Sequence, residues 1–184
     1  MTTQADYTVQ EWALLTETPT IVGLGMLVAA QSGPMGKVRE VLAFCSCLRR
    51  ETGLAIERRD HLISAILEEQ PLRHRALIAP LFSDGDPIPL LNAILTARLH
   101  MTEHCEKVAD VLADRTPYPE AQEFKRWLMW LARRIAQAGG GGWLGRRAMI
   151  TDTEERMLDQ LAVSLGIVTI VDALASERGE PLGM

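Results

Sequence analysis

The most constraining feature of this sequence is the spacing of its apolar residues, which recur every three or four positions in several separate stretches. This period matches the 3.6 residues per turn of an α-helix and places the apolar side chains on one face. No stretch shows the sustained alternation of a β-strand. The clearest stripe runs from residue 86 to about 113 and comprises Leu90, Ile94, Met101, Cys105, Val108 and Leu112. The spacing therefore predicts an all-α protein.

Breaks between these stretches predict how many helices there are. Thr8-Val-Gln-Glu11 has the form of a capping box and opens a first helix, and Thr18-Pro19 predicts a restart. The helix from there to about Ala30 is nearly all apolar, so we expect it to be central, with a neighbouring helix close to Gly23 and Gly25. The remaining helices are expected at 34–52, 56–69, 71–82, 86–113, 120–138 and 151–166.

The expected architecture is a compact multi-helix bundle of about seven or eight helices in a single domain, residues 1–184. Thr151-Asp-Thr-Glu154 predicts a second capping box. The apolar tail from Ile167 to Ala175 is expected to dock, either as further helix or as an extended cover. An apolar helix, a glycine break and a second amphipathic helix occur in both halves of the chain, which indicates a degenerate internal repeat.

Composition narrows the function class. The chain carries 19 Lys and Arg against 24 Asp and Glu, a net charge of -5, which argues against a general nucleic-acid partner. The longest apolar run, Ile21 to Ala30, is about half of the ~20 residues that a transmembrane helix needs. The first residues show no secretory signal pattern. A cytoplasmic location with no transmembrane segment is expected, and with it reduced, packed cysteines.

The sharpest candidate for chemistry is His100-Met-Thr-Glu103-His104, an H-x-x-E-H motif. In one class of metalloprotease two such histidines bind zinc and the glutamate activates the bound water. On a helix, however, His104 lies about 80° and His100 about 120° from the centre of the apolar stripe, and Glu103 points away from the core. Two boundary histidines, one bonded to a backbone carbonyl, are the structural alternative to a divalent-metal site at His100 and His104.

A second candidate is the only locally basic stretch of note, from residue 120 to 147. A solvated helix face explains it most simply. The alternative is a docking surface for an acidic partner or for a second copy of the chain, because Met129 and Trp130 occupy opposite shoulders of the apolar stripe. The residues of this candidate surface are Lys125, Arg126, Trp130, Arg133, Arg134, Arg146 and Arg147.

Residues 124–166 combine a helix (FKRWLMWLARRIAQ), a GGGG loop and a Glu-capped helix ending in Leu-Gly (TDTEERMLDQLAVSLG). This arrangement resembles the second half of a family of uncharacterised bacterial helical proteins, whose opening is similar to EWALLTETPTIVGLGMLVAAQSGPMG. It also resembles the TerB-like domain of tellurite-resistance proteins. That resemblance implies a non-enzymatic helical bundle, a link to stress response and divalent-metal binding. The acidic Asp-Gly loop of TerB-like domains is replaced by Gln31-Ser32-Gly33 and Gly140-Gly141-Gly142, so no metal ligands carry over.

These observations favour a non-catalytic helical scaffold or interaction protein that self-associates and needs no cofactor. One alternative is a metal-binding protein or metal-dependent hydrolase using His100 and His104. Asp60 or Glu57 close to that pair would favour it. Another is a carrier of a small apolar ligand, which a cavity lined by Met26, Leu27 and Trp127 would favour.

Overall fold

The regular elements of the protein are all helical. They are a short 3-10 helix η1 (Gln4–Asp6), α1 (Val9–Ala29), α4 (Ile88–Arg115), α5 (Tyr118–Gly139) and α6 (Asp152–Ser164). Two further helical segments cover residues 42–48 and 62–69, and no strand occurs in the described part of the chain. The prediction of an all-α fold is confirmed. The computed structural model describes residues 2–29, 40, 42–48, 62–69, 88–139 and 150–167; for 28–29, 88–99 and 139 it describes the backbone only.

Six α-helices are present in these residues, where the sequence predicts seven or eight. Two differences account for the lower count. The expected short helix at 71–82 lies outside the described residues, and the first two expected helices are in fact one. The two glycine breaks on which the internal repeat rests, and the tail beyond Ile167, also lie outside them.

Helix α1 begins as predicted but does not stop where predicted. The Thr8 amide donates to Glu11 Oε2 at 2.7 Å and the Glu11 amide donates back to Thr8 Oγ1 at 3.2 Å, which completes the capping box. Pro19 lies inside α1, so the predicted restart at Thr18-Pro19 is wrong. A proline normally ends a helix because it cannot donate to the carbonyl four residues earlier. Here Leu15 and Val22, on either side of it, are fully buried in a common core, and this packing keeps the helix continuous.

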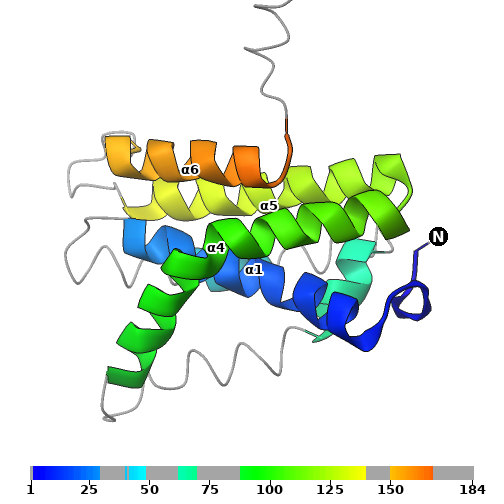
Figure 1. Cartoon of the computed structure of the whole chain (residues 1–184). Coiled ribbons are helices and arrows are strands. Elements are labelled where there is room, and N and C mark those ends of the chain that lie inside the picture. Colours follow the sequence, from blue (N-terminus) through cyan, green and yellow to red (C-terminus); the bar gives the residue numbers. More distant parts are fainter. Residues whose placement is uncertain are drawn as a thin grey trace, which may run out of the picture.

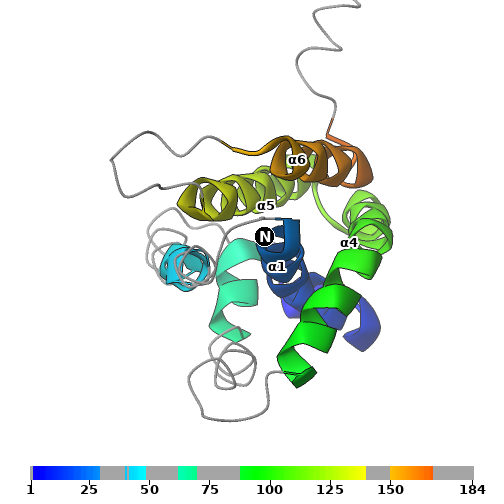
Figure 2. The ribbon, with the colours of Figure 1, turned by 90° about the vertical axis from the view of Figure 1, so that its left-hand side faces the viewer.

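The arrangement of the helices explains why α1 is so apolar. In Figure 1, α5 and α6 run side by side above α1, while α4 crosses in front of it. The view in Figure 2 shows α1 enclosed by α4, α5, α6 and the two segments 42–48 and 62–69. Contacts of α1 with α4, α5 and α6 agree with that view. The second half of α1 has almost no solvent face, since residues 18–27 are buried apart from the half-buried Ile21, so the predicted central position of this apolar stretch is confirmed.

Two glycines of α1 let its neighbours approach closely, as predicted. A Cβ atom on Gly23 would lie 2.5 Å from the ring of Phe44, in segment 42–48. A Cβ atom on Gly25 would lie 2.5 Å from Met101 Sδ of α4. Both distances are too short for a side chain, so the helix-propensity cost of these glycines is offset by close packing.

The predicted apolar stripes of the later helices form the core that these contacts build. The buried side chains are Met101, Cys105, Val108 and Leu112 of α4, Phe124, Trp127, Leu128, Leu131 and Ile135 of α5, and Met157, Leu158, Leu161 and Ala162 of α6. Helix α6 starts with the predicted capping box, in which Thr151 and Glu154 exchange hydrogen bonds. It is followed by Gly166, whose φ of 63° suits glycine.

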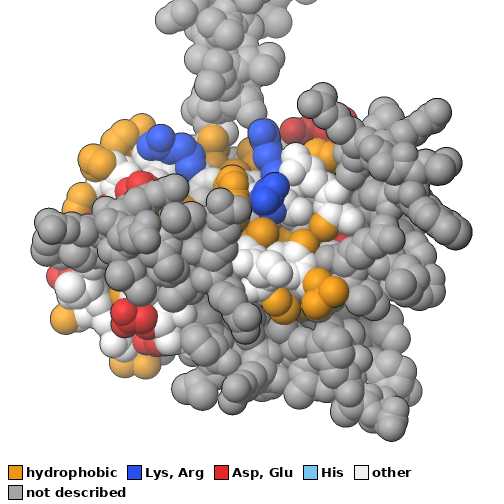
Figure 3. Space-filling model, turned by 180° about the vertical axis from the view of Figure 1, so that it is seen from behind, with side chains coloured by type: hydrophobic (Ala, Val, Ile, Leu, Met, Phe, Trp, Pro, Cys, Tyr) orange, Lys and Arg blue, Asp and Glu red, His pale blue; other side chains and the backbone are white. Residues whose placement is uncertain are grey.

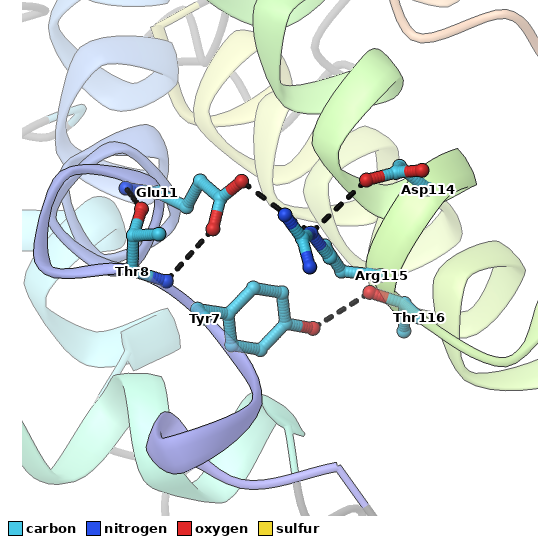
Figure 4. Close-up of polar contacts among 6 residues, drawn as sticks. All are labelled: Tyr7, Thr8, Glu11, Asp114, Arg115 and Thr116. Carbon is cyan, nitrogen blue, oxygen red and sulfur yellow. Dashed lines mark hydrogen bonds and ion pairs between the residues drawn. The ribbon is translucent and has the colours of Figure 1, made fainter.

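The start of α1 is fastened to the end of α4 by polar contacts (Figure 4). The hydroxyl groups of Tyr7 and Thr116 share a buried hydrogen bond of 2.6 Å. Beside it, Glu11 Oε1 lies 3.5 Å from Arg115 Nε. Burial raises the pKa of Tyr7, so the phenol stays protonated and neutral. The buried Tyr7–Thr116 hydrogen bond therefore holds the two helix ends together at this end of the bundle.

Within the part of the chain that the structure describes, every helix falls short of what a membrane span requires in length and apolar character.

Candidate functional site

The structure divides the predicted basic surface on α5 into exposed and buried members. Arg126, Arg133 and Arg134 are exposed, and Trp130 is half-buried beside them. Arg146 and Arg147 lie outside the described residues. The Arg134 guanidinium carbon is 5.8 Å from the centre of the Trp130 ring, a cation–π contact worth about 0.5–1 kcal/mol at an exposed site. The indole is thus held at the surface by a charged neighbour on its own helix.

Lys125 does not belong to this face, which corrects the sequence-based grouping. Its side chain is only 7 % exposed, and its Nζ lies 3.8 Å from the point where a Cβ atom on Gly166 would be. Burial lowers the pKa of the Lys125 amine, and the negative charge of Asp110 acts against that shift. The amine therefore lies near the carboxyl end of α6, where the exposed carbonyl dipoles favour a positive charge. Lys125 is therefore packed next to the end of α6 rather than exposed with the arginines.

A groove of about 330 Å³ runs between α5 and α6. Its lining combines charged walls with apolar surface and comprises Arg126, Met129, Trp130, Arg133, Leu158, Asp159, Ala162 and Ile167. The sequence places Met129 and Trp130 on opposite shoulders of α5, whereas the folded chain brings both into one groove. Seen from behind in Figure 3, Lys and Arg side chains lie among hydrophobic ones on the upper part of the molecule, where α5 runs. This mixture is typical of a surface that binds another chain segment.

The two histidines of the H-x-x-E-H motif have different surroundings. His104 is half-buried, and its Nε2 lies 3.1 Å from both the Leu14 carbonyl oxygen and Thr18 Oγ1 of α1. A carbonyl oxygen only accepts, so Nε2 carries the proton and donates it to Leu14. Burial lowers the pKa of His104, which favours this neutral form. Only Nδ1 then retains a lone pair that a metal could use.

His100, in contrast, is 62 % exposed, and its Nδ1 lies 3.7 Å from Glu103 Oε2. The other carboxylate oxygen of Glu103 accepts a 2.7 Å hydrogen bond from Lys107 Nζ. That hydrogen bond is the main reason why the pKa of Glu103 is lowered. A carboxylate whose pKa is lowered by a lysine is a weaker base, so Glu103 is a poor candidate for a general base.

No group of three His, Cys, Asp or Glu side chains in the described residues is arranged to hold a metal ion. Asp60 and Glu57, the carboxylates that would favour a metal near His104, lie outside these residues, so the metal hypothesis stays a prediction. Cys105 follows His104 in the sequence but is fully buried, and burial raises the pKa of its thiol to about 12. That thiol stays protonated at neutral pH and is a poor nucleophile.

The side chains expected to line a cavity for an apolar ligand are packed against other core residues. Met26 is fully buried and Leu27 is 5 % exposed, and both belong to the same core cluster as Trp127. The buried indole N–H of Trp127 has no hydrogen-bond partner in the described part of the chain. The carrier hypothesis also stays a prediction.

Sequence reasoning missed the groove itself. Arg126 and Asp159 lie on separate helices, and no local spacing indicates which faces of α5 and α6 lie next to each other. The sequence feature that could have indicated it is that Met129 and Trp130 flank the apolar stripe of α5 on both sides. A helix with a single buried face has no need of apolar side chains at both positions.

Comparison of the chain with protein-family models, with curated proteins and with solved structures finds no match. The interpretation of this site therefore rests on its geometry and charge.

Proposed function

We propose that this chain is a non-catalytic interaction protein, that the α5–α6 groove with its arginine wall is its contact surface, and that an acidic surface is its partner. The observation that carries the proposal is the exposed row of Arg126, Arg133 and Arg134 beside the half-buried Trp130 and Met129. Tryptophan and arginine are the side chains most enriched among residues that dominate protein–protein binding energy. A solvated helix face needs the arginines but not the aromatic and thioether groups between them.

A non-catalytic role is supported by the fate of the polar groups that chemistry would need. His104 donates to a backbone carbonyl, Glu103 is paired with Lys107, and Cys105 is buried. His104 and Cys105 therefore serve the packing of the bundle, and Glu103 is engaged by an exposed lysine of its own helix. A cytoplasmic location, a stress-linked role and a TerB-like relationship belong to the same proposal, and they rest on the sequence pattern.

A second copy of the chain is the first partner to test. The outer face of α4 carries four exposed acidic side chains, Glu103, Glu106, Asp110 and Asp114. Glu103 and Asp114 pair with Lys107 and Arg115 of the same chain, so Glu106 and Asp110 supply most of the net negative charge of this face. Such a face on one copy complements the arginine wall on another, and opposite surface potentials steer association and set its specificity. We therefore propose self-association through the arginine wall of one copy and the α4 face of the next.

Sedimentation velocity over a range of protein and salt concentrations tests this proposal. Arg133→Glu is expected to weaken self-association about tenfold or more, because it places like charges together, and added salt should weaken the wild-type contact. Arg133→Lys is the matched control, since it keeps the charge and should retain most of the association. Glu106→Arg combined with Arg133→Glu should restore it in part.

A chain that stays monomeric at every concentration would overturn the self-association proposal. Equal association of the wild type, Arg133→Glu and Arg133→Lys would show that copies meet elsewhere and remove α5 from the contact.

A further inference from the structure

The acidic face of α4 points away from the bundle. The buried side chains of this helix are Met101, Cys105, Val108 and Leu112. At 100° per residue, Glu106 and Asp110 lie on average about 150° from the centre of that buried stripe. Both side chains are exposed. The negative charge of α4 is therefore presented on the side of the helix opposite the core.

The arginine wall of α5 points outward in the same way. Arg126 and Arg133 are seven positions apart, or about two helical turns, so they lie on one line along the helix. The buried stripe of α5 comprises Phe124, Trp127, Leu128, Leu131 and Ile135. The line of the two arginines lies about 170° from the centre of this stripe. Both arginines are exposed and line the groove with α6.

The two charged surfaces belong to helices that lie diagonally across the bundle. Helices α1 and α6 each pack against both α4 and α5. In Figure 2, α5 lies towards the left and α4 towards the right, with α1 and α6 between them. Helix α4 crosses in front of α1 in Figure 1, whereas Figure 3 shows Lys and Arg side chains on the face seen from behind. Because each charged surface points outward from its own helix, the positive and the negative surface face opposite sides of the molecule.

Surfaces on opposite sides of one copy cannot both engage the same second copy. A two-fold dimer would need the arginine wall and the acidic face side by side, because the same patch of each copy meets that of its partner. A contact between the wall of one copy and the α4 face of the next uses only one surface of each. The resulting pair still presents a free wall at one end and a free acidic face at the other. A further copy can therefore bind at either end through the same contact.

We propose that this chain assembles head to tail and that the assembly continues beyond a dimer. The inference rests on the proposed contact between the arginine wall and the α4 face, and it adds the direction in which the copies follow one another. Each added copy repeats the same contact, so growth stops only when the series closes into a ring or the free protein is depleted. Since opposite charges meet at every contact, added salt should shorten the series.

Two variants with neutral side chains test the direction of assembly. Arg126→Gln combined with Arg133→Gln removes the charge of the wall and keeps the α4 face. Glu106→Gln combined with Asp110→Asn removes most of the charge of the α4 face and keeps the wall. All four side chains are exposed, so the core is left intact. A chain that carries all four substitutions is the matched control, because it has neither charged surface.

Sedimentation velocity distinguishes the possible assemblies. The sedimentation coefficient of the wild type should keep rising with protein concentration past that of a dimer. Each double variant alone should associate about tenfold more weakly or less. Mixed in equal amounts, the two double variants should form a one-to-one dimer that grows no further, since only one intact contact can form. Adding the variant without the wall to the wild type should lower the average size of the assembly, and adding the control should not.

Three results would contradict head-to-tail assembly. A wild type that stops at a dimer at every concentration would overturn this inference and leave the arginine wall as a contact surface. A wild type that stays monomeric would overturn the proposed self-association, and this inference with it. Mixed double variants that stay monomeric, or that grow beyond a dimer, would show that the copies of an associating wild type meet through other surfaces.

Discussion

The histidine pair of α4 and the arginine wall of α5 are both exposed in part and both sequence-predicted, yet they differ in what their polar atoms do. His104 gives its Nε2 proton to Leu14 on another helix, and Glu103 is occupied by Lys107. The guanidinium groups of Arg126 and Arg133 instead line an open groove. Polar groups that are already satisfied inside the fold contribute to stability, whereas polar groups facing a groove are available for recognition.

The largest expected effect separates the two histidines from each other. His104→Ala should lower the free energy of unfolding by about 0.5–1.5 kcal/mol, because it removes one hydrogen bond to the Leu14 carbonyl oxygen, which keeps the bond from the Thr18 hydroxyl. His100→Ala should change it by less than about 0.5 kcal/mol, since the side chain is exposed. Urea denaturation followed by circular dichroism measures both. Equal losses from the two variants would break the distinction between a structural and a surface histidine.

The pH dependence of stability sharpens the same point. Burial lowers the pKa of His104 below its usual 6.5, with the Leu14 hydrogen bond and the Glu17 charge opposing this and Lys107 reinforcing it. Near pH 6.5 the unfolded chain therefore binds a proton that the folded chain does not. The free energy of unfolding should fall as the pH drops from 6.5 towards the lower pKa of His104 in the folded state. Above pH 6.5 the stabilising contribution of neutral His104 is fully present.

Urea titrations of the wild type and His104→Gln across this pH window isolate that contribution, because the other histidines are common to both. The wild type should lose more stability than His104→Gln as the pH falls. Parallel pH profiles would mean that His104 titrates alike in the folded and unfolded chains.

A smaller effect is expected at the indole on the groove wall. Arg134→Gln should reduce the free energy of unfolding by about 0.5–1 kcal/mol through loss of the cation–π contact with Trp130. A double-mutant cycle with Trp130→Leu measures the coupling directly. Additive losses would show that the guanidinium does not hold the ring, and would weaken the case for a preformed recognition surface.

The smallest expected effect on stability is at Arg126, and association then distinguishes this exposed residue of α5 from the buried Lys125. Arg126→Met should leave the free energy of unfolding within about 0.5 kcal/mol of the wild type but weaken association. Lys125→Met should leave association unchanged, because its amine lies by Gly166 rather than on the groove. Urea denaturation and sedimentation velocity of both variants provide the comparison. Weaker association of Lys125→Met would show that Lys125 belongs to the interaction surface after all.

Local sequence pattern predicted most of what local physics controls. The capping boxes at Thr8 and Thr151 form as expected because their donors and acceptors lie within one turn. The stripe of α4 from Met101 to Leu112 is buried because helical period fixes which side chains share a face. The same reasoning failed at Pro19, where burial of the surrounding residues outweighed the preference of proline for a helix start.

The sequence by itself determined that the chain is helical, that the apolar stretch after Pro19 is central and that Gly23 and Gly25 admit close neighbours, because period, apolarity and side-chain size are local properties. Only the tertiary structure decided that His104 bonds to Leu14, that Lys125 is buried beside Gly166, and that α5 and α6 enclose a groove. These contacts join residues dozens of positions apart. Their formation depends on how whole helices pack, and helical period constrains that packing without specifying it.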